Sequence, residues 1–66
     1  MRRLRTLRKL AGWSLAEVDE RSGINIARLS NAENGKVKLS THESYMLRSI
    51  LTAAIAERQK KAAESQ

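Results

Sequence analysis

The sequence predicts one small all-α domain spanning residues 1–66. Composition is the first indication, because proline and phenylalanine are absent, glycine occurs only three times, and helix-forming residues fill the stretches between. The second is the placement of the glycines at 12, 23 and 35, each after a stretch with apolar residues at helical spacing. Helix-capping signals are the third. We therefore expect a compact bundle of four to five helices, the last much longer than the others.

The first expected helix covers residues 1–11 and is amphipathic. Leu4, Leu7 and Ala11 recur at helical spacing, Leu10 lies beside them, and the glycine that follows ends the helix. We expect Leu4, Leu7 and Leu10 to enter the core.

The other faces of this first helix are basic, carrying Arg2, Arg3, Arg5 and Lys9. Cations near a helix N-terminus oppose the helix dipole, at a cost of about a few tenths of a kcal/mol per charge. Two interpretations stay open: the arginines contact phosphate, or they form a solvated basic face.

We expect two short helices joined by a tight turn in residues 14–35. Ser14 is an N-cap with Glu17 three positions on, which forms a capping box, and Asn25 is a second N-cap. Gly23 permits the left-handed backbone that ends the first of these helices. Two such helices joined at a glycine are typical of a helix-turn-helix. The positions expected to face inward are Val18, Ile24, Leu29 and Ala32, with Trp13 at the edge.

A long helix is expected over about residues 41–63, after a basic loop at Lys36–Leu39. Ser40 followed by Glu43 is a third capping signal. The apolar residues of this helix cover about half of its circumference, which is wider than the small core needs. We therefore expect a homodimer formed with the same helix of a second subunit. The residues assigned to that interface are Met46, Ile50, Ala54 and Ile55.

The charge balance favours an anionic partner. Thirteen Lys and Arg against seven Asp and Glu give a net charge of +6, and the pI is about 10.6. Such a domain favours nucleic acid first and an acidic membrane second. We expect no membrane association, because no stretch approaches the roughly 18 apolar residues of a membrane span. The apolar stripe of the basic helix is also needed for the core.

Neither enzymatic activity nor a cofactor is expected. Cysteine is absent, the one histidine, His42, is expected to face solvent, and no metal-ligand cluster or nucleotide-binding loop occurs. The absence of cysteine also fits a cytoplasmic location.

The segment LRKLAGWSLAEVDERSGINIARLSNAENGK, residues 7–36, resembles the helix-turn-helix of the Cro/C1 repressor family, also called the XRE family. The match covers about residues 4–39 without an insertion. It implies a lambda-repressor-like domain that binds double-stranded DNA as a dimer, with the second motif helix in the major groove. The residues that match the family pattern in register are Leu7, Arg8, Ser14, Glu17, Val18, Gly23, Ile24, Ser30, Glu33, Asn34 and Gly35.

The resemblance also implies site residues. Base contacts are assigned by position to Ile26, Ala27 and Asn31. Arg8 and Glu33 match a family pair that joins the first and third helices as an ion pair. The resemblance and the basic charge together assign contacts with the DNA backbone to Arg2, Arg3, Arg5, Asn25, Arg28, Ser30, Asn34, Lys36 and Lys38.

Three positions depart from the family pattern. Leu15 stands where a glutamine usually reaches phosphate, a contact that leucine cannot make. Asp19 replaces a small alanine where the two motif helices touch, and either Arg28 or free amides of the second helix are expected to satisfy it. Ile26 stands where glutamine or arginine often reads a base. Ile26 offers only apolar contact, so direct readout is assigned to Asn31, and DNA shape supplies more of the specificity.

Two functions follow from these observations. The first is a sequence-specific DNA-binding transcriptional regulator, most simply a small repressor of phage or mobile-element type that binds an inverted-repeat operator. The alternative is an antitoxin-like or adaptor module that uses the helix-turn-helix as a scaffold for an unidentified protein partner. Asp19 and the apolar residues Ile26 and Ala27 favour the alternative, because they weaken the DNA-facing surface.

Overall fold

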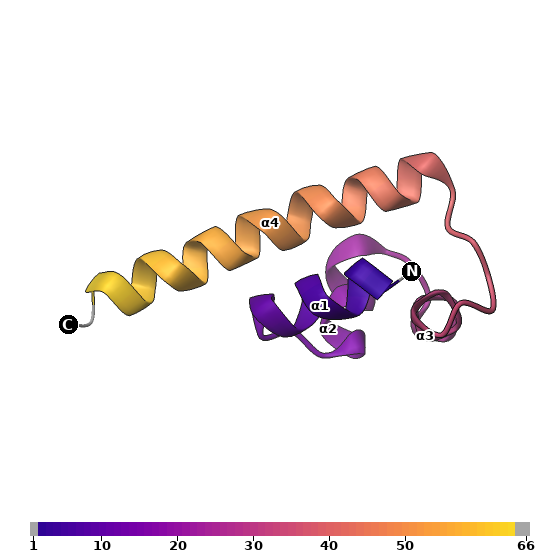
Figure 1. Ribbon diagram of the computed structural model, residues 1–66, viewed down its shortest axis with the longest axis horizontal. Coiled ribbons are helices and arrows are strands. Elements are labelled where there is room, and N and C mark those ends of the chain that lie inside the picture. The colour runs from indigo at the N-terminus through magenta and orange to yellow at the C-terminus, as the bar shows by residue number, and fades with distance from the viewer. Residues whose placement is uncertain (1, 65–66) are drawn as a thin grey trace.

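The computed structural model describes the backbone of residues 2–64 and the side chains of residues 4–63. The described chain forms α1 (Arg2–Ala11), α2 (Leu15–Ser22), α3 (Ile26–Glu33) and α4 (Thr41–Glu64). The predicted all-α bundle with a long last helix is therefore confirmed. Helix α4 crosses the molecule alongside α1, its most extensive partner, and its C-terminal half extends past the other helices (Figure 1).

The helix ends follow local capping residues. Ser14 Oγ accepts a hydrogen bond from the Glu17 N–H at 3.1 Å, and Asn25 Oδ1 accepts one from the Ala27 N–H at 2.8 Å. Gly23 ends α2 with a φ of 76°, in the left-handed region that a side chain disfavours. Each of these contacts joins residues at most three positions apart. The helix ends can therefore be predicted from the sequence alone.

The two expected capping boxes differ in the structure. At α4 the box is reciprocal: the Glu43 N–H donates to Ser40 Oγ at 3.0 Å, and the Ser40 N–H donates to Glu43 Oε1 at 2.9 Å. At α2 the Glu17 carboxylate instead accepts from Arg21 Nε at 3.0 Å. Among the described residues, only the serine half of the α2 box is present.

The core lies where the four helices meet. The positions expected to face inward within residues 14–35 are all buried, and Trp13 is half-buried at the edge. The core residues are Leu4, Ala11, Val18, Ile24, Leu29, Ala32, Leu47 and Leu51. The prediction for Leu10 is wrong, because 55% of this residue is exposed. Leu10 lies about 120° around the helix axis from Leu4, at the far edge of the apolar stripe.

The apolar stripe of α4 is already used within the chain. Leu47 and Leu51 are fully buried. Beside them, the four residues assigned to a dimer interface are partly buried against the same core: Met46, Ile50, Ala54 and Ile55. Stripe width alone therefore does not require a second subunit.

Within residues 2–64, no helix is both long and apolar enough to cross a membrane.

Candidate nucleic-acid interface

Helix α3 presents one open face. Its inner side is buried and consists of Leu29, Ala32 and Glu33. The side chains assigned to DNA fall on the remaining circumference: Asn25, Ile26, Ala27, Arg28 and Asn34 are exposed, whereas Ser30 and Asn31 are half-exposed. The residues expected to face bases thus lie on the part of a short helix that the core does not cover, with Asn31 half-exposed.

Protein side chains occupy the first amides of α3. Asp19 Oδ2 accepts a hydrogen bond from the Ile26 N–H at 2.8 Å, and Asn25 Oδ1 accepts one from the Ala27 N–H at the same distance. Of the two ways of satisfying Asp19, the structure contains the backbone amide and not Arg28. Asp19 therefore caps α3 from α2 and joins the two motif helices.

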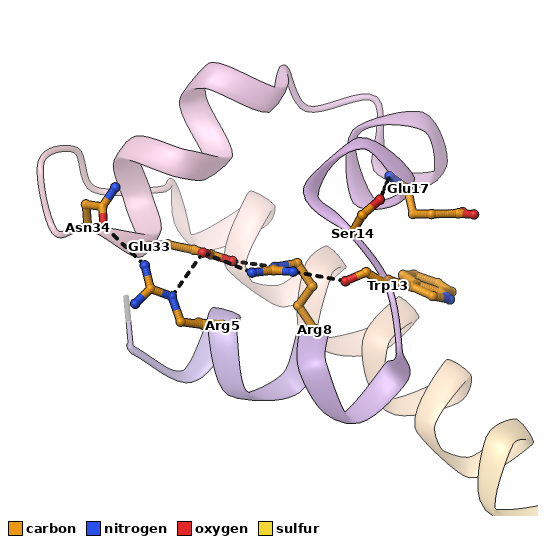
Figure 2. Close-up of polar contacts among 7 residues, drawn as sticks. All are labelled: Arg5, Arg8, Trp13, Ser14, Glu17, Glu33 and Asn34. Atoms are coloured by element: carbon orange, nitrogen blue, oxygen red, sulfur yellow. Dashed lines mark hydrogen bonds and ion pairs between the residues drawn. The ribbon is translucent and has the colours of Figure 1, made fainter.

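Glu33 is the centre of a charged network that joins α1 to α3 (Figure 2). Only 3% of its side chain is exposed. Arg8 Nε donates to Glu33 Oε1 at 2.7 Å, which is the ion pair that the resemblance implies, and Arg8 Nη1 donates to the Trp13 carbonyl at 3.0 Å. Arg5 Nε donates to Glu33 Oε2 at 3.3 Å. Two arginines from consecutive turns of α1 thus hold the C-terminal end of α3.

This network shifts the titration of Glu33. Burial raises the pKa of the carboxyl, but the hydrogen bonds and charges of Arg8 and Arg5 outweigh burial and lower the pKa below its ordinary value. Glu33 is therefore ionised at neutral pH.

Arg5 also orients Asn34. Arg5 Nη2 lies 3.2 Å from Asn34 Oδ1. Because a guanidinium only donates hydrogen bonds, the amide oxygen must face Arg5, and the amide NH₂ points away from it, as Figure 2 shows. Asn34 is an exposed residue, and its two amide N–H groups are not used by this contact. Arg5, predicted from the sequence to contact the DNA backbone, is bound to Glu33 and Asn34, and its side chain is 49% exposed.

Arg28, assigned to the DNA backbone, is bound to α4. Its Nη2 and Nε donate to the two oxygens of Glu43, at 2.7 and 3.0 Å. The hydrogen bond from Arg28, followed by that from the Ser40 backbone, lowers the pKa of Glu43 to about 2, and the same contact raises the pKa of Arg28. No property of the sequence singles out Glu43 as this partner, because the two residues lie 15 positions apart.

The positive charge lies mainly beside the motif. Residues 14–35 contain four acidic and two basic side chains. In contrast, Lys36 and Lys38 are exposed in the loop after α3, and α1 carries five basic residues. The side chains of Arg2 and Arg3 lie outside the described residues. Leu15 is half-buried against the core, consistent with its inability to bind phosphate.

A family model described as a helix-turn-helix domain matches residues 2–59. The chain belongs to this helix-turn-helix family. The family occurs in Cro/C1-type (XRE) regulators, so the match agrees with the resemblance seen in the sequence and identifies the protein as a DNA-binding regulator of that general kind. Searches of curated proteins and of solved structures returned no match.

The helix-turn-helix assignment covers α1, α2, α3 and most of α4. The arginines that hold Glu33 and the glutamate that holds Arg28 both belong to segments outside the two motif helices. Within the described part of the chain, no group of His, Cys, Asp and Glu could hold a metal ion.

Proposed function

We propose that this helix-turn-helix protein is a sequence-specific transcriptional regulator, a small repressor of phage or mobile-element type acting on DNA in a bacterial cytoplasm. The observation that carries the proposal is the open face of α3, whose opposite side is locked by Leu29, Ala32 and Glu33. A helix anchored in this way can enter a major groove while its own fold stays intact.

The proposal is tested by selecting bound duplexes from a random DNA pool. Mobility shifts on the selected duplex should show a log affinity that falls steeply with log salt, because basic residues displace counterions from phosphates. Equal affinity for selected and unrelated duplexes at every salt concentration would contradict a sequence-specific regulator.

We propose that Asn31 makes the main base contact, because an asparagine side chain can pair with adenine through two hydrogen bonds. Ile26 and Ala27 supply apolar contact, for example with a thymine methyl group. Asn31→Ala should lose preference for the selected duplex, with a loss of about 1–3 kcal/mol in discrimination. Lys36→Ala is the matched control, because loss of a phosphate contact weakens selected and unrelated duplexes alike. Undiminished preference in Asn31→Ala would contradict this placement.

We propose that DNA phosphates are bound by residues just before and just after α3. Asn34 contributes its amide NH₂ and Lys36 and Lys38 their exposed ammonium groups. Asn25 retains its amide NH₂, since only its oxygen caps α3. The remaining backbone contacts assigned from the sequence belong to the same surface: Arg2, Arg3, Arg5, Arg28 and Ser30.

We propose a homodimer formed through α4, which binds an inverted repeat. A helix of 24 residues is about 36 Å long, whereas the molecule measures 20 and 19 Å across its shorter axes. Residues 56–63 are all exposed although Arg58 Nη1 donates to the Leu10 carbonyl at 3.1 Å, and a helix with little buried surface is only marginally stable in water. A second copy packed against α4, beside Ile50 and Ala54, buries more of this helix.

The dimer is tested by sedimentation equilibrium over a range of concentrations. The expected mass is twice 7.4 kDa, and Ala53→Glu, at an exposed position of α4, should shift the equilibrium toward the monomer. A mass of one chain at every concentration, with and without DNA, would contradict the dimer.

The excess of acidic over basic side chains in residues 14–35 favours a second candidate, an antitoxin-like or adaptor module. Purified protein that shows no salt-sensitive binding to any duplex, but retains a protein from lysate, would support this second function over the first.

A further inference from the structure

Arg28 is held on one edge only. The contacts from Nε and Nη2 to the two oxygens of Glu43 form the bidentate fork that suits a planar guanidinium and a carboxylate. A guanidinium carries five N–H groups, and this fork uses one of Nε and one of Nη2. The second N–H of Nη2 and one N–H of Nη1 remain, and together they form the adjacent end edge of the guanidinium.

This second edge is open. Among the described residues, none accepts a hydrogen bond from Nη1 of Arg28, and the side chain is exposed. Two oxygens of a phosphodiester match a guanidinium edge as well as a carboxylate does. Arg28 also lies three residues before Asn31, so the two are neighbours on α3.

Glu43 is itself immobilised. Its backbone N–H donates to Ser40 Oγ, and its carboxylate accepts the Ser40 N–H, so the acid is fixed at both ends by the α4 capping box. Arg28 is therefore ordered before any DNA arrives, and the ordering entropy of a long side chain is not lost on binding.

We propose that Arg28 is a pre-positioned phosphate contact and that Glu43 is its positioning residue, holding one guanidinium edge so that the other donates to a DNA phosphate. The phosphate flanks the base read by Asn31. This inference rests on the proposed DNA-binding function and adds α4 to the DNA-binding apparatus.

The decisive variant is Glu43→Gln. Glutamine preserves the capping box but replaces one acceptor oxygen of the fork by an NH₂ group. Removing an acid near a polyanion should tighten binding if charge alone mattered. If Glu43 positions Arg28, Glu43→Gln should instead bind DNA more weakly. We expect its affinity for the duplex selected from the random pool to fall on the order of tenfold, measured by fluorescence anisotropy. Arg28→Ala should lose at least as much, and adding Glu43→Gln to Arg28→Ala should cause no further loss.

Ser40→Ala is the matched control, because it removes the hydroxyl that caps α4 but keeps the backbone N–H of residue 40, which still holds the Glu43 carboxylate beside Arg28. Its affinity should stay within about twofold of the wild type.

Phosphate-ethylation interference shows which phosphate is contacted. Arg28→Ala and Glu43→Gln should each lose interference at the same phosphate and retain it elsewhere. Circular dichroism checks folding, and Arg28→Lys, which keeps the charge but loses the fork, provides a second variant that should also bind more weakly.

Three outcomes overturn the inference. Equal or tighter binding by Glu43→Gln would show that Glu43 competes with phosphate for Arg28. Loss of interference at every phosphate alike would show that Glu43 acts on the placement of α3 as a whole. Wild-type protein with no salt-sensitive affinity for any duplex would instead refute the proposed function on which the inference rests.

Discussion

Replacing Glu33 by glutamine should destabilise the fold by about 2–3 kcal/mol, between the cost of breaking a buried pair and that of an exposed one. The side chain is 3% exposed and Arg8, its nearest partner, is 15% exposed. Glutamine keeps the shape but leaves the Arg8 guanidinium without a compensating charge. The other partner, Arg5, is half-exposed and regains water, which keeps the loss below that of a fully buried pair.

Such a loss is large for this chain. A domain of this size has a total stability of roughly 3–10 kcal/mol, and the expected fall in Tm is about 10–20 °C. Urea unfolding followed by circular dichroism measures it. Glu17→Gln is the control, because Glu17 pairs with Arg21 at a similar distance of 3.0 Å but is 46% exposed. That control should change stability by less than about 0.5 kcal/mol, and an equal loss in both variants would refute the argument from burial.

The same variant should alter the pH dependence of stability. The pKa of Glu33 is lowered in the folded state, so the carboxylate stabilises the fold above its unfolded pKa of about 4.3. That contribution is lost as the pH falls through the lower folded pKa. Unfolding free energies measured from pH 7 to acid should therefore decline less steeply for Glu33→Gln than for the wild type.

Two further predictions concern the core and the helix ends, both measured by thermal unfolding. Leu47→Ala removes a fully buried side chain and should cost about 2–5 kcal/mol, whereas Leu10→Ala, at an exposed position, should stay within about 0.5 kcal/mol. Gly12→Ala and Gly23→Ala should destabilise the fold by similar amounts of about 1–2 kcal/mol, because both glycines have positive φ. An added Cβ at Gly12 meets Arg58 Nη1 at 2.7 Å, but this guanidinium is the end of an exposed, flexible side chain and can move away. A clearly larger loss at Gly12 that disappears when Arg58→Ala is added would contradict this reasoning.

The residues expected to read bases are uncharged, whereas the basic residues expected to bind phosphate lie mostly in the flanking segments. The open face of α3 carries Ile26, Ala27 and Asn31, none of which is charged. The basic groups nearest to it are supplied by α1 and by the loop after α3, while Arg28 is neutralised by Glu43. Variants in the flanking segments should therefore change the salt dependence of DNA binding, and variants at Ile26, Ala27 and Asn31 should change sequence preference.

The sequence by itself was sufficient for the helices and most of the core. Ser14, Gly23, Asn25 and Ser40 mark helix ends through hydrogen bonds or backbone angles that involve residues at most a few positions away. Apolar periodicity likewise identifies a buried face, because one helix turn brings every third or fourth residue together. Capping residues and apolar periodicity are both local features, so they can be recognised without knowledge of the tertiary structure.

Only the tertiary structure decided which charged groups meet. The resemblance supplied the pair of Arg8 and Glu33, but nothing in the sequence indicated that Arg5 would join it or that Arg28 would bind Glu43, because these contacts span 28 and 15 positions. For Asp19 the sequence left two partners open, Arg28 and the free amides of α3, and only packing selected the amide of Ile26. The partner of a long polar side chain depends on how the helices cross, and a difference of a few ångströms separates a hydrogen bond from a solvated charge. The helix-turn-helix was therefore predictable from local patterns, whereas the arrangement of its DNA-facing charges was settled by packing.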